Sequence, residues 1–328
     1  MTAAGLVDGF GRVATDLRVS LTDRCNLRCD YCMPAEGLPW LPQPELLTDD
    51  ELVRVVGVLA GEGIRTVRLT GGEPLLRPGV VDLVRRLVEL GLRLSLTTNG
   101  LALRRLAQPL ADAGLARVNV SLDTLRPERF LELTRRDRHA DVVAGLEAAA
   151  AAGLTPVKVN AVLMRGRNDD EAGELLDWCL ERGYELRFIE QMPLDPQHGW
   201  DRALMVTADE VLADLSARYA LTPAEDRGSA PAETWLVDGG PARVGIVGSV
   251  TRPFCGTCDR LRLTADGQLR NCLFAREESD LRAPLRSGAT DAELAERARL
   301  AVAGKRAGHG IDDPGFLQPQ RPMSAIGG

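Results

Sequence analysis

Five segments in the first two-thirds of the chain alternate apolar and polar residues with a period of two. In the first, DLRVSLT at residues 16–22, three apolar residues alternate with Arg18, Ser20 and Thr22. A period of two places the apolar set on one face of a β-strand and the polar set on the other. With one further candidate, we expect strands at 16–22, 66–70, 92–97, 117–123, 157–163 and 186–191.

Helical patterns separate these strands. Thr48 followed by Glu51 has the spacing of a capping box at the start of the first helix, and Thr207 with Glu210 has it further along. Strands that alternate with helices predict a parallel sheet with right-handed crossovers. The helices are expected at 49–62, 79–90, 103–113, 140–152 and 169–182, with later ones at 207–220 and 291–302.

Six strands are fewer than the eight that close a TIM barrel, so we predict an α/β fold built on a partial (β/α)6 barrel. The helices must cover the apolar face of the sheet, which leaves the polar face to line the lumen. A barrel that needed only packing would fill its lumen with Val, Ile and Leu. The polar pattern therefore predicts a barrel built around a polar ligand. We expect this barrel to span residues 1–220, followed by a C-terminal extension at 221–328.

Composition narrows the choice of ligand. The 328 residues include 40 Lys and Arg against 47 Asp and Glu, a net charge of −7. An acidic chain is a poor candidate for binding nucleic acid or an anionic membrane, so any anionic ligand needs a local cluster of cations. The chain shows neither a signal-peptide pattern nor an apolar run near 18 residues, and we expect a cytoplasmic protein.

Cysteine is the most informative residue type. Cys25, Cys29 and Cys32 follow the first expected strand within eight residues. In an intracellular protein, clustered cysteines are more often metal ligands than disulfides. Zinc usually takes a fourth ligand, and no Cys or His lies nearby. Three thiolates on a four-iron cube would leave one iron open to an exogenous ligand. Three incidental loop cysteines remain the alternative.

A second triplet, Cys255, Cys258 and Cys272, lies in the C-terminal third around a hairpin-like turn. It offers another three-ligand site, with a zinc knuckle lacking a visible fourth ligand as the alternative. The seventh cysteine, Cys179, lies in a helical segment and is expected to be a buried small hydrophobe. Asn271, just before Cys272, receives no predicted role.

The motif CNLRCDYC after a first strand, with GGEP after the second, resembles the radical S-adenosylmethionine (SAM) superfamily. The resemblance implies a [4Fe–4S] cluster on Cys25, Cys29 and Cys32, with SAM chelating the open iron. It also implies SAM contacts at Tyr31, Gly72, Ser121 and Met192. Taken alone, Ser121 would be a solvated strand end, and Met192 would fill a gap in the core.

The segment FCGTCDRLRLTADGQLRNCLF is similar to the C-terminal cluster segment of the GTP 3′,8-cyclase family. The similarity extends through TTNG, SLD, VKVN and RFIE to the terminal Gly-Gly. It implies a second [4Fe–4S] cluster on Cys255, Cys258 and Cys272 that faces GTP. It further implies GTP contacts at Arg18, Arg68, Thr97, Lys158, Arg260, Leu261 and Arg262, and a mobile tail ending in Gly327 and Gly328 that enters the active site.

Buried cations are costly unless they meet an anion. A triphosphate would supply it; the alternative is pairing with lumenal acids such as Asp123 or Glu190. For the tail, the alternative is a frayed chain end.

The family resemblance implies the SAM-dependent radical conversion of GTP to (8S)-3′,8-cyclo-7,8-dihydroguanosine 5′-triphosphate, the first step of molybdenum cofactor synthesis. It implies a reductant protein of flavodoxin or ferredoxin type and a downstream cyclic pyranopterin monophosphate synthase, with the enzyme itself a monomer or homodimer. Two other classes stay open. A peptide-modifying radical SAM maturase usually carries more C-terminal cysteines, and a non-catalytic iron–sulfur sensor needs no SAM pocket.

Overall fold

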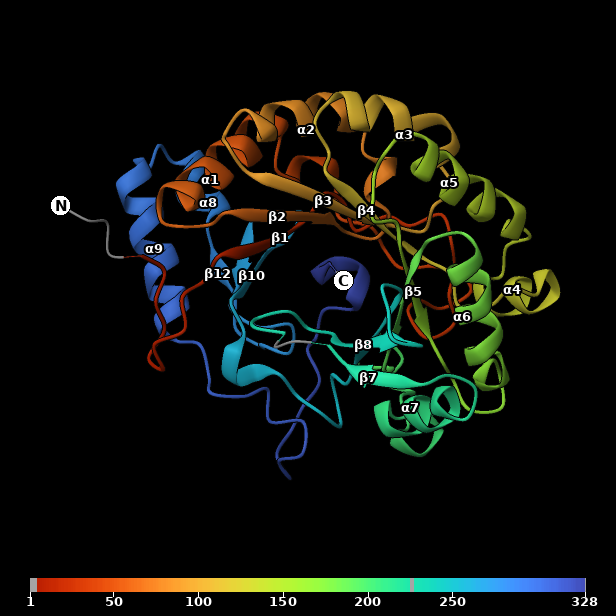
Figure 1. Ribbon diagram of the computed structural model, residues 1–328. Coiled ribbons are helices and arrows are strands. Elements are labelled where there is room, and N and C mark those ends of the chain that lie inside the picture. Colours follow the sequence, from red (N-terminus) through yellow and green to blue (C-terminus); the bar gives the residue numbers. More distant parts are fainter. Residues whose placement is uncertain (1–4, 225–226, 328) are drawn as a thin grey trace.

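The computed structural model describes residues 5–224 and 227–327. Its strands form one open sheet that curves around a central space, with helices on the outer face (Figure 1). The six predicted strands are confirmed, each with both ends within two residues of the expected position. They are β1 (Asp16–Ser20), β2 (Thr66–Thr70), β3 (Arg93–Thr98), β4 (Arg117–Ser121), β5 (Lys158–Val162) and β6 (Glu185–Ile189).

The predicted helices between these strands are also confirmed, although the last begins with a short 3-10 turn at Asp169–Glu171. A further helix, α4 (Pro127–Thr134), was not predicted from the sequence. Both expected capping boxes are formed, at Thr48 with Glu51 and at Thr207 with Glu210. The helices of the barrel are α1 (Asp49–Gly61), α2 (Val80–Val88), α3 (Leu103–Asp112), α4, α5 (His139–Ala151) and α6 (Ala172–Glu181).

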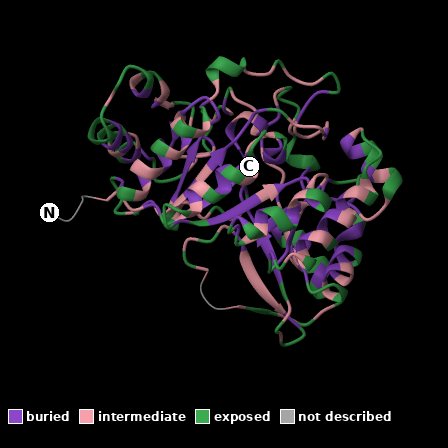
Figure 2. Cartoon of the chain, turned by 90° about the horizontal axis from the view of Figure 1, so that it is seen from above, coloured by how far each residue is buried: buried purple, intermediate pink, exposed green. Residues whose placement is uncertain are grey.

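The period-two pattern predicted the two faces of the sheet correctly. Leu17 and Val19 of β1 are fully buried, as are Leu94 and Leu96 of β3, and all four belong to the main hydrophobic core. The buried strands lie inside a shell of helices whose outer surfaces are exposed (Figure 2). The polar residues of the same strands point into the central space, where they meet one another.

The C-terminal third extends this sheet at both edges. β9 (Arg243–Val247) pairs in parallel with β6, and β10 (Arg260–Leu263) pairs in parallel with β1. The parallel order is therefore β10-β1-β2-β3-β4-β5-β6-β9. Antiparallel strands finish the edges: β11 (Gln268–Arg270) and β12 (Ser279–Asp280) on one side, β8 (Glu233–Val237) and β7 (Leu221–Pro223) on the other.

The remaining helices are α7 (Ala208–Ser216), α8 (Arg282–Arg286), α9 (Asp291–Ala303) and α10 (Met323–Ile326). Helix α9 packs outside the barrel against α1, whereas the C-terminal end of the chain lies in the centre of the ring (Figure 1). Within the described part of the chain, no helix combines the length and apolar character needed to cross a membrane.

Candidate active site

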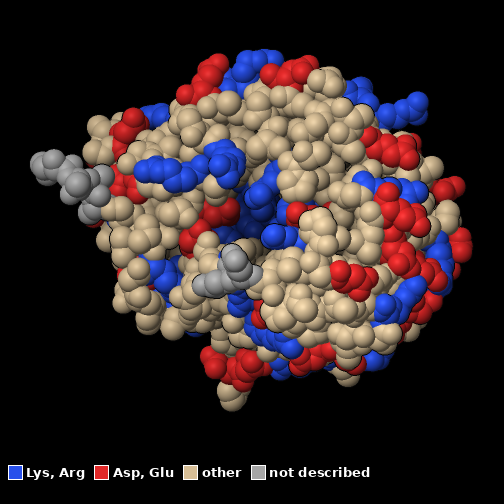
Figure 3. Space-filling model, in the orientation of Figure 1, with Lys and Arg blue, Asp and Glu red and all other residues tan. Residues whose placement is uncertain are grey.

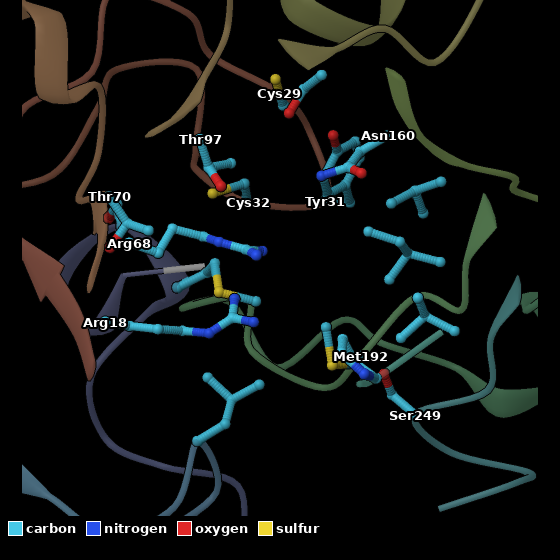
Figure 4. Close-up of a pocket in the computed structure, with 18 of the residues that line it drawn as sticks. Arg18, Cys29, Tyr31, Cys32, Arg68, Thr70, Thr97, Asn160, Met192 and Ser249 are labelled. Carbon is cyan, nitrogen blue, oxygen red and sulfur yellow. The ribbon is translucent and has the colours of Figure 1, made fainter. Parts of the chain in front are cut away.

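The curved sheet encloses a cavity of about 340 Å³. All six triplet cysteines line it, together with polar residues from the lumenal faces of the strands. Blue Lys and Arg side chains are concentrated in this hollow (Figure 3). Arg18, Arg68 and Thr97 point into it from one wall, with Met192 and Ser249 on the opposite side (Figure 4).

The first triplet lies on the loop that follows β1. Its three thiols are free, and the loop folds on itself through a hydrogen bond from the Cys32 backbone N–H to the Cys29 carbonyl, 3.0 Å long. Burial raises the pKa of Cys29 well above its usual value and raises that of Cys32 to about 12. Binding a cation cluster would offset this cost of ionising buried thiols.

The GGEP segment after β2 holds this loop in place. Gly72 donates to the Thr22 carbonyl and Glu73 to the Arg24 carbonyl, each at 2.7 Å. A Cβ on Gly72 would lie 2.3 Å from the Arg24 carbonyl oxygen, so only glycine allows this approach of two backbones. The family resemblance implies a SAM contact at Gly72. In the structure, Gly72 allows the close approach of the cysteine loop.

The carboxylate of Glu73 joins the ends of two strands. It accepts hydrogen bonds from the Leu75 N–H at 2.9 Å, the Thr98 hydroxyl at 2.8 Å and the Asn99 N–H at 2.7 Å. Burial raises its pKa to about 7 despite these bonds. The Asn99 side-chain nitrogen lies 4.0 Å from the Cys25 sulfur. Glu73 thus connects β2, β3 and the cysteine loop.

The predicted SAM contacts all lie on the cavity that contains the first triplet, although Met192 packs in a small apolar cluster with Cys272 of the second triplet. Tyr31, Gly72, Ser121 and Met192 all line the cavity. The Tyr31 hydroxyl donates to Asp123 at 2.7 Å, and Asp123 also accepts from the Val162 N–H at 2.9 Å. Burial raises the pKa of Asp123 to about 6. The ring of Tyr31 is therefore held by the end of β4.

The second triplet lies at the start of β10 and after β11. A short 3-10 turn carries Cys255, and Cys258 ends it. The Lys305 ammonium donates to the carbonyls of Cys258 and Arg260, each at 3.0 Å, and lies 3.5 Å from the Cys258 sulfur. Burial tends to raise the pKa of Cys258, but Arg260 and Lys305 outweigh it and lower that pKa to about 7.

Arginines form a row across three neighbouring strands. Arg18 of β1 is in register with Arg68 of β2 on one side and with Arg262 of β10 on the other. Like charges on adjacent strands destabilise a sheet. Burial lowers the pKa of all three, in Arg68 and Arg262 well below the usual value. Within the described residues, the nearest acid to any of them is Asp16, 3.9 Å from Arg18.

The lumenal acids do not neutralise this row. Asp123 is occupied by Tyr31, and Glu190 accepts the backbone N–H groups of Ala208, Val250 and Thr251 at 2.7 to 2.9 Å. Arg260 lies over the ring of Phe254 with 4.7 Å to its centroid, and its Nη2 is buried without a partner. The Thr97 hydroxyl, which lines the cavity, is likewise buried and unpaired.

Two of the predicted GTP contacts do not line the cavity. Lys158 pairs with Glu185, its neighbour in register on β6, so its charge is already neutralised. Leu261 alternates with the two lumenal arginines of β10, which places its side chain on the helix-covered face in the hydrophobic core. A contact from Leu261 would have to come from its backbone.

The C-terminal tail enters the lumen. The Gly327 carbonyl accepts a hydrogen bond from Arg262, and the Ser324 backbone lies near the thiol of Cys32. Gly327 has a φ of +88°, and a Cβ there would lie 2.4 Å from the Thr70 hydroxyl. The described tail is therefore packed inside the barrel rather than frayed. Gly328 lies outside the described residues.

One lumenal cation was missed from the sequence. Arg187 of β6 lines the cavity, and burial lowers its pKa to about 10. Its alternation with Leu186 and Phe188 is the same period-two signal used for the other strands and could have revealed it.

Cys179 is fully buried in the core, as predicted. Asn271 donates to the Ala301 carbonyl at 2.8 Å and anchors α9.

A parallel partial barrel with a three-cysteine loop after its first strand defines a protein of the radical SAM class. Residues 19–179 match the model of the radical SAM superfamily, and residues 184–311 match the model described as Molybdenum Cofactor Synthesis C. Within that class, the chain belongs to the family of GTP 3′,8-cyclases.

That membership rests on curated relatives. The GTP 3′,8-cyclase of Streptomyces coelicolor is 67% identical, over 98% of this chain and 96% of the relative. GTP 3′,8-cyclase 2 of Mycobacterium tuberculosis is 57% identical, over 100% of this chain and 93% of the relative.

Among solved structures, Streptococcus suis SuiB bound to precursor peptide SuiA matches with a TM-score of 0.60. It shares 15% identity over 85% of this chain and 67% of its own. Methylornithine synthase (PylB) matches with a TM-score of 0.50 and 18% identity, covering 62% of each chain. At these identities the likeness concerns the fold alone.

Proposed function

We propose that this chain acts on GTP as its relatives' name states, converting it to (8S)-3′,8-cyclo-7,8-dihydroguanosine 5′-triphosphate. In this proposal the N-terminal triplet holds a [4Fe–4S] cluster with SAM, and the C-terminal triplet holds a second one. When bound, the first cluster and SAM supply a radical that abstracts hydrogen from the GTP ribose. The chain's own residues position both molecules and exclude water.

One observation carries the proposal: both triplets line one cavity, which also contains a row of three largely buried arginines, and within the described residues the only ion pair of this row is the 3.9 Å contact of Arg18 with Asp16. Desolvated guanidinium groups without a counter-ion cost free energy, and a triphosphate would remove that cost. Arginine also matches phosphate oxygens through its planar fork of donors. Arg18, Arg68, Arg260 and Arg262 are the proposed triphosphate contacts, with Thr97 as a hydroxyl donor.

The donor sets fit clusters better than single ions. Among residues 5–224 and 227–327, no three Cys, His, Asp or Glu side chains converge closely enough to hold one metal ion. Zinc needs its ligands within about 2.0–2.3 Å of a single point. A four-iron cube spreads its cysteines over several corners. Both triplets, with their thiols free, therefore suit a multinuclear cluster.

Different residues along the cavity are proposed to bind SAM, to bind GTP and to act during the reaction. Tyr31, Gly72, Ser121 and Met192 are the proposed contacts of SAM beside the first triplet. Lys158 is retained as a GTP contact only if the nucleotide displaces Glu185 from it. The tail glycine Gly327 sits against Thr70 and Arg262 and is proposed to act during the chemistry.

Two other functions are less well supported. A peptide-modifying maturase would need an open lumen for its peptide, whereas the lumen of this barrel contains the chain's own tail. An iron–sulfur sensor gives no reason for buried arginines without counter-ions. A protein reductant, a downstream synthase that consumes the product and a cytoplasmic location complete the proposal.

One anaerobic assay tests it. Reconstituted protein is mixed with SAM, GTP and dithionite, and the products are separated by chromatography with mass detection. The proposal expects 5′-deoxyadenosine and a cyclised nucleotide that retains the mass of GTP. Formation of 5′-deoxyadenosine with unchanged GTP, in the presence of intact clusters, would contradict the substrate assignment.

A further inference from the structure

A second, shallower cleft lies on the outer surface beside the first cysteine triplet. It runs between the cysteine loop, the 3-10 turn Pro74–Leu76, the start of α3 and the residue before α5. Asn26, which lines it, is covalently joined to Cys25. Its lining residues are Asn26, Leu75, Leu76, Leu101, Ala102, Arg104, Arg105 and Arg138.

The cleft is basic on a chain that is acidic as a whole. None of its lining residues is acidic, although the chain's net charge is −7. Arg104 and Arg105 are exposed, and neither side chain makes an ion pair or hydrogen bond within the described residues. Arg138 pairs with Asp141. Two free guanidinium groups thus face solvent from the first turn of α3.

These arginines do not serve the stability of their helix. The positive end of a helix dipole favours acids in the first turn, yet α3 has none there and no side-chain cap. By contrast, α1 begins with a capping box and three acids. The charge at the start of α3 therefore needs another explanation, and an acidic partner supplies one.

A short bonded route connects the cleft with the cluster loop. The Asn99 side chain donates to the Asn26 side chain at 2.7 Å and lies 4.0 Å from the Cys25 sulfur. Asn99 also lines the inner cavity, so this pair of asparagines forms part of the wall between the cavity and the cleft. An electron arriving at the cleft would cross only this wall to reach the first triplet.

Four of the eight residues that line the cleft are apolar. Leu76 is 40% exposed, and Leu101 and Ala102 lie partly exposed beside it. The apolar residues of the cleft match the exposed, apolar edge of a flavin ring. The arginines beside them match acidic residues around that ring. A ferredoxin-type carrier, whose cluster lies beneath a polar loop, would leave the apolar residues of the cleft exposed to water.

We propose that this cleft is the docking site of a flavodoxin-type carrier, an acidic flavoprotein that delivers single electrons. The inference rests on the proposed function, because it assumes a cluster on Cys25, Cys29 and Cys32. One electron leaves the reduced flavin, which is oxidised, and enters that cluster, which is reduced; no bond forms or breaks. Transient electron-transfer complexes have small interfaces, and charge guides their association. A small basic cleft fits both properties.

The test measures binding and electron delivery separately. Oxidised flavodoxin is titrated into the cluster-loaded protein without SAM or GTP, so that binding is measured independently of activity, at low and high salt. Arg104→Glu with Arg105→Glu should weaken binding at least about tenfold at low salt, and high salt should reduce the difference. Arg297→Glu, an exposed site on α9 away from α3, is the matched control and should bind normally.

With clusters loaded, 5′-deoxyadenosine formation is then compared for two reductants. The double variant should need at least about ten times more reduced flavodoxin for half-maximal rate, with an unchanged rate in dithionite. Unchanged flavodoxin dependence, or an equal loss in Arg297→Glu, would overturn the docking site. A loss seen only with a reduced ferredoxin would overturn the flavoprotein assignment. If the unmodified protein forms no 5′-deoxyadenosine with dithionite, the result would contradict the proposed function rather than the docking site.

Discussion

The two cysteine triplets have the same number of ligands but differ in the charge around one thiol of each, Cys29 and Cys258. Around the first, burial dominates and neighbouring acids such as Asp123 add to it, so the pKa of Cys29 rises. Around the second, Arg260 and Lys305 outweigh burial and lower the pKa of Cys258 to about 7. Cys258 therefore lies on the more cationic side of the second triplet, because burial raises the pKa of its neighbour Cys255.

The two cysteine loops are also held in place by different sets of contacts. The first loop is held by backbone bonds to Gly72 and Glu73 and by Arg135, which donates to the carbonyls of Arg28 and Met33, each at 3.0 Å. The second loop is held by charged side chains that arrive from distant segments, Lys305 and Arg12, the latter donating to the Cys255 carbonyl at 2.6 Å. Charged side chains from distant segments thus hold both loops, and the first loop has the additional backbone bonds to the GGEP segment.

Replacing each triplet by alanine should separate the two ends most sharply. Loss of Cys25, Cys29 and Cys32 should remove half of the bound iron and all SAM cleavage. Loss of the second triplet should also remove half of the iron but leave uncoupled SAM cleavage. Iron and sulfide analysis with a 5′-deoxyadenosine assay measures both. Stoichiometric zinc in the second site of freshly purified protein would contradict the two-cluster proposal.

Removing one arginine beside the second triplet should weaken GTP binding without affecting SAM cleavage. Arg262→Ala should reduce GTP affinity by about 1.5–3 kcal/mol, the scale of a charge-assisted contact. Arg260→Ala is expected to behave in the same way, and both should retain uncoupled SAM cleavage because the first triplet is untouched. Calorimetry measures the affinity, with Arg297→Ala as the control. Normal GTP binding by both variants would refute the triphosphate placement.

A methyl group on the tail should distinguish binding from turnover. Gly327→Ala would place a Cβ 2.4 Å from the Thr70 hydroxyl at a φ of +88°, so the tail should leave the lumen. Turnover should fall while GTP affinity is kept, as it should after deletion of Gly327 and Gly328. Parallel calorimetry and product assays show whether the two properties separate. A matching loss of affinity would mean that the tail helps to bind the nucleotide.

The smallest expected effect concerns the charge beside Cys258. Lys305→Met removes a cation 3.5 Å from that sulfur, so the proposed second cluster should lose stabilisation of its reduced state and its potential should become more negative. The first cluster should keep its potential. Redox titration followed by electron paramagnetic resonance measures both clusters in one sample. Equal shifts at both would indicate a general structural change instead.

The barrel could be predicted because its signals are local. Alternation within β1 to β5 fixed which face each side chain takes, and this follows from strand geometry alone. The parallel pairing of β1 with β10 could not be predicted, since no local pattern specifies a partner so distant in sequence. Helix α4 was missed for a different reason: its start at Pro127 reads as a loop.

The candidate site shows the same limit. The cysteine triplets could be recognised from spacing, and Arg18 and Arg68 from alternation. Lys158 alternates in the same way, yet its neighbour in register, Glu185, neutralises it. Arg187 shows the signal but was overlooked. The role of Lys305 depends on a tertiary contact with Cys258 that has no sequence signature.

The pairing of β10 with β1 also sets an order of assembly during synthesis. The first cysteine loop and the strands that hold it are complete early in the chain, whereas the arginine row requires a strand from its last quarter. Contacts between distant segments form slowly, and domains fold as their sequence emerges from the ribosome. A nascent chain therefore completes the first cysteine loop well before the arginine row can assemble.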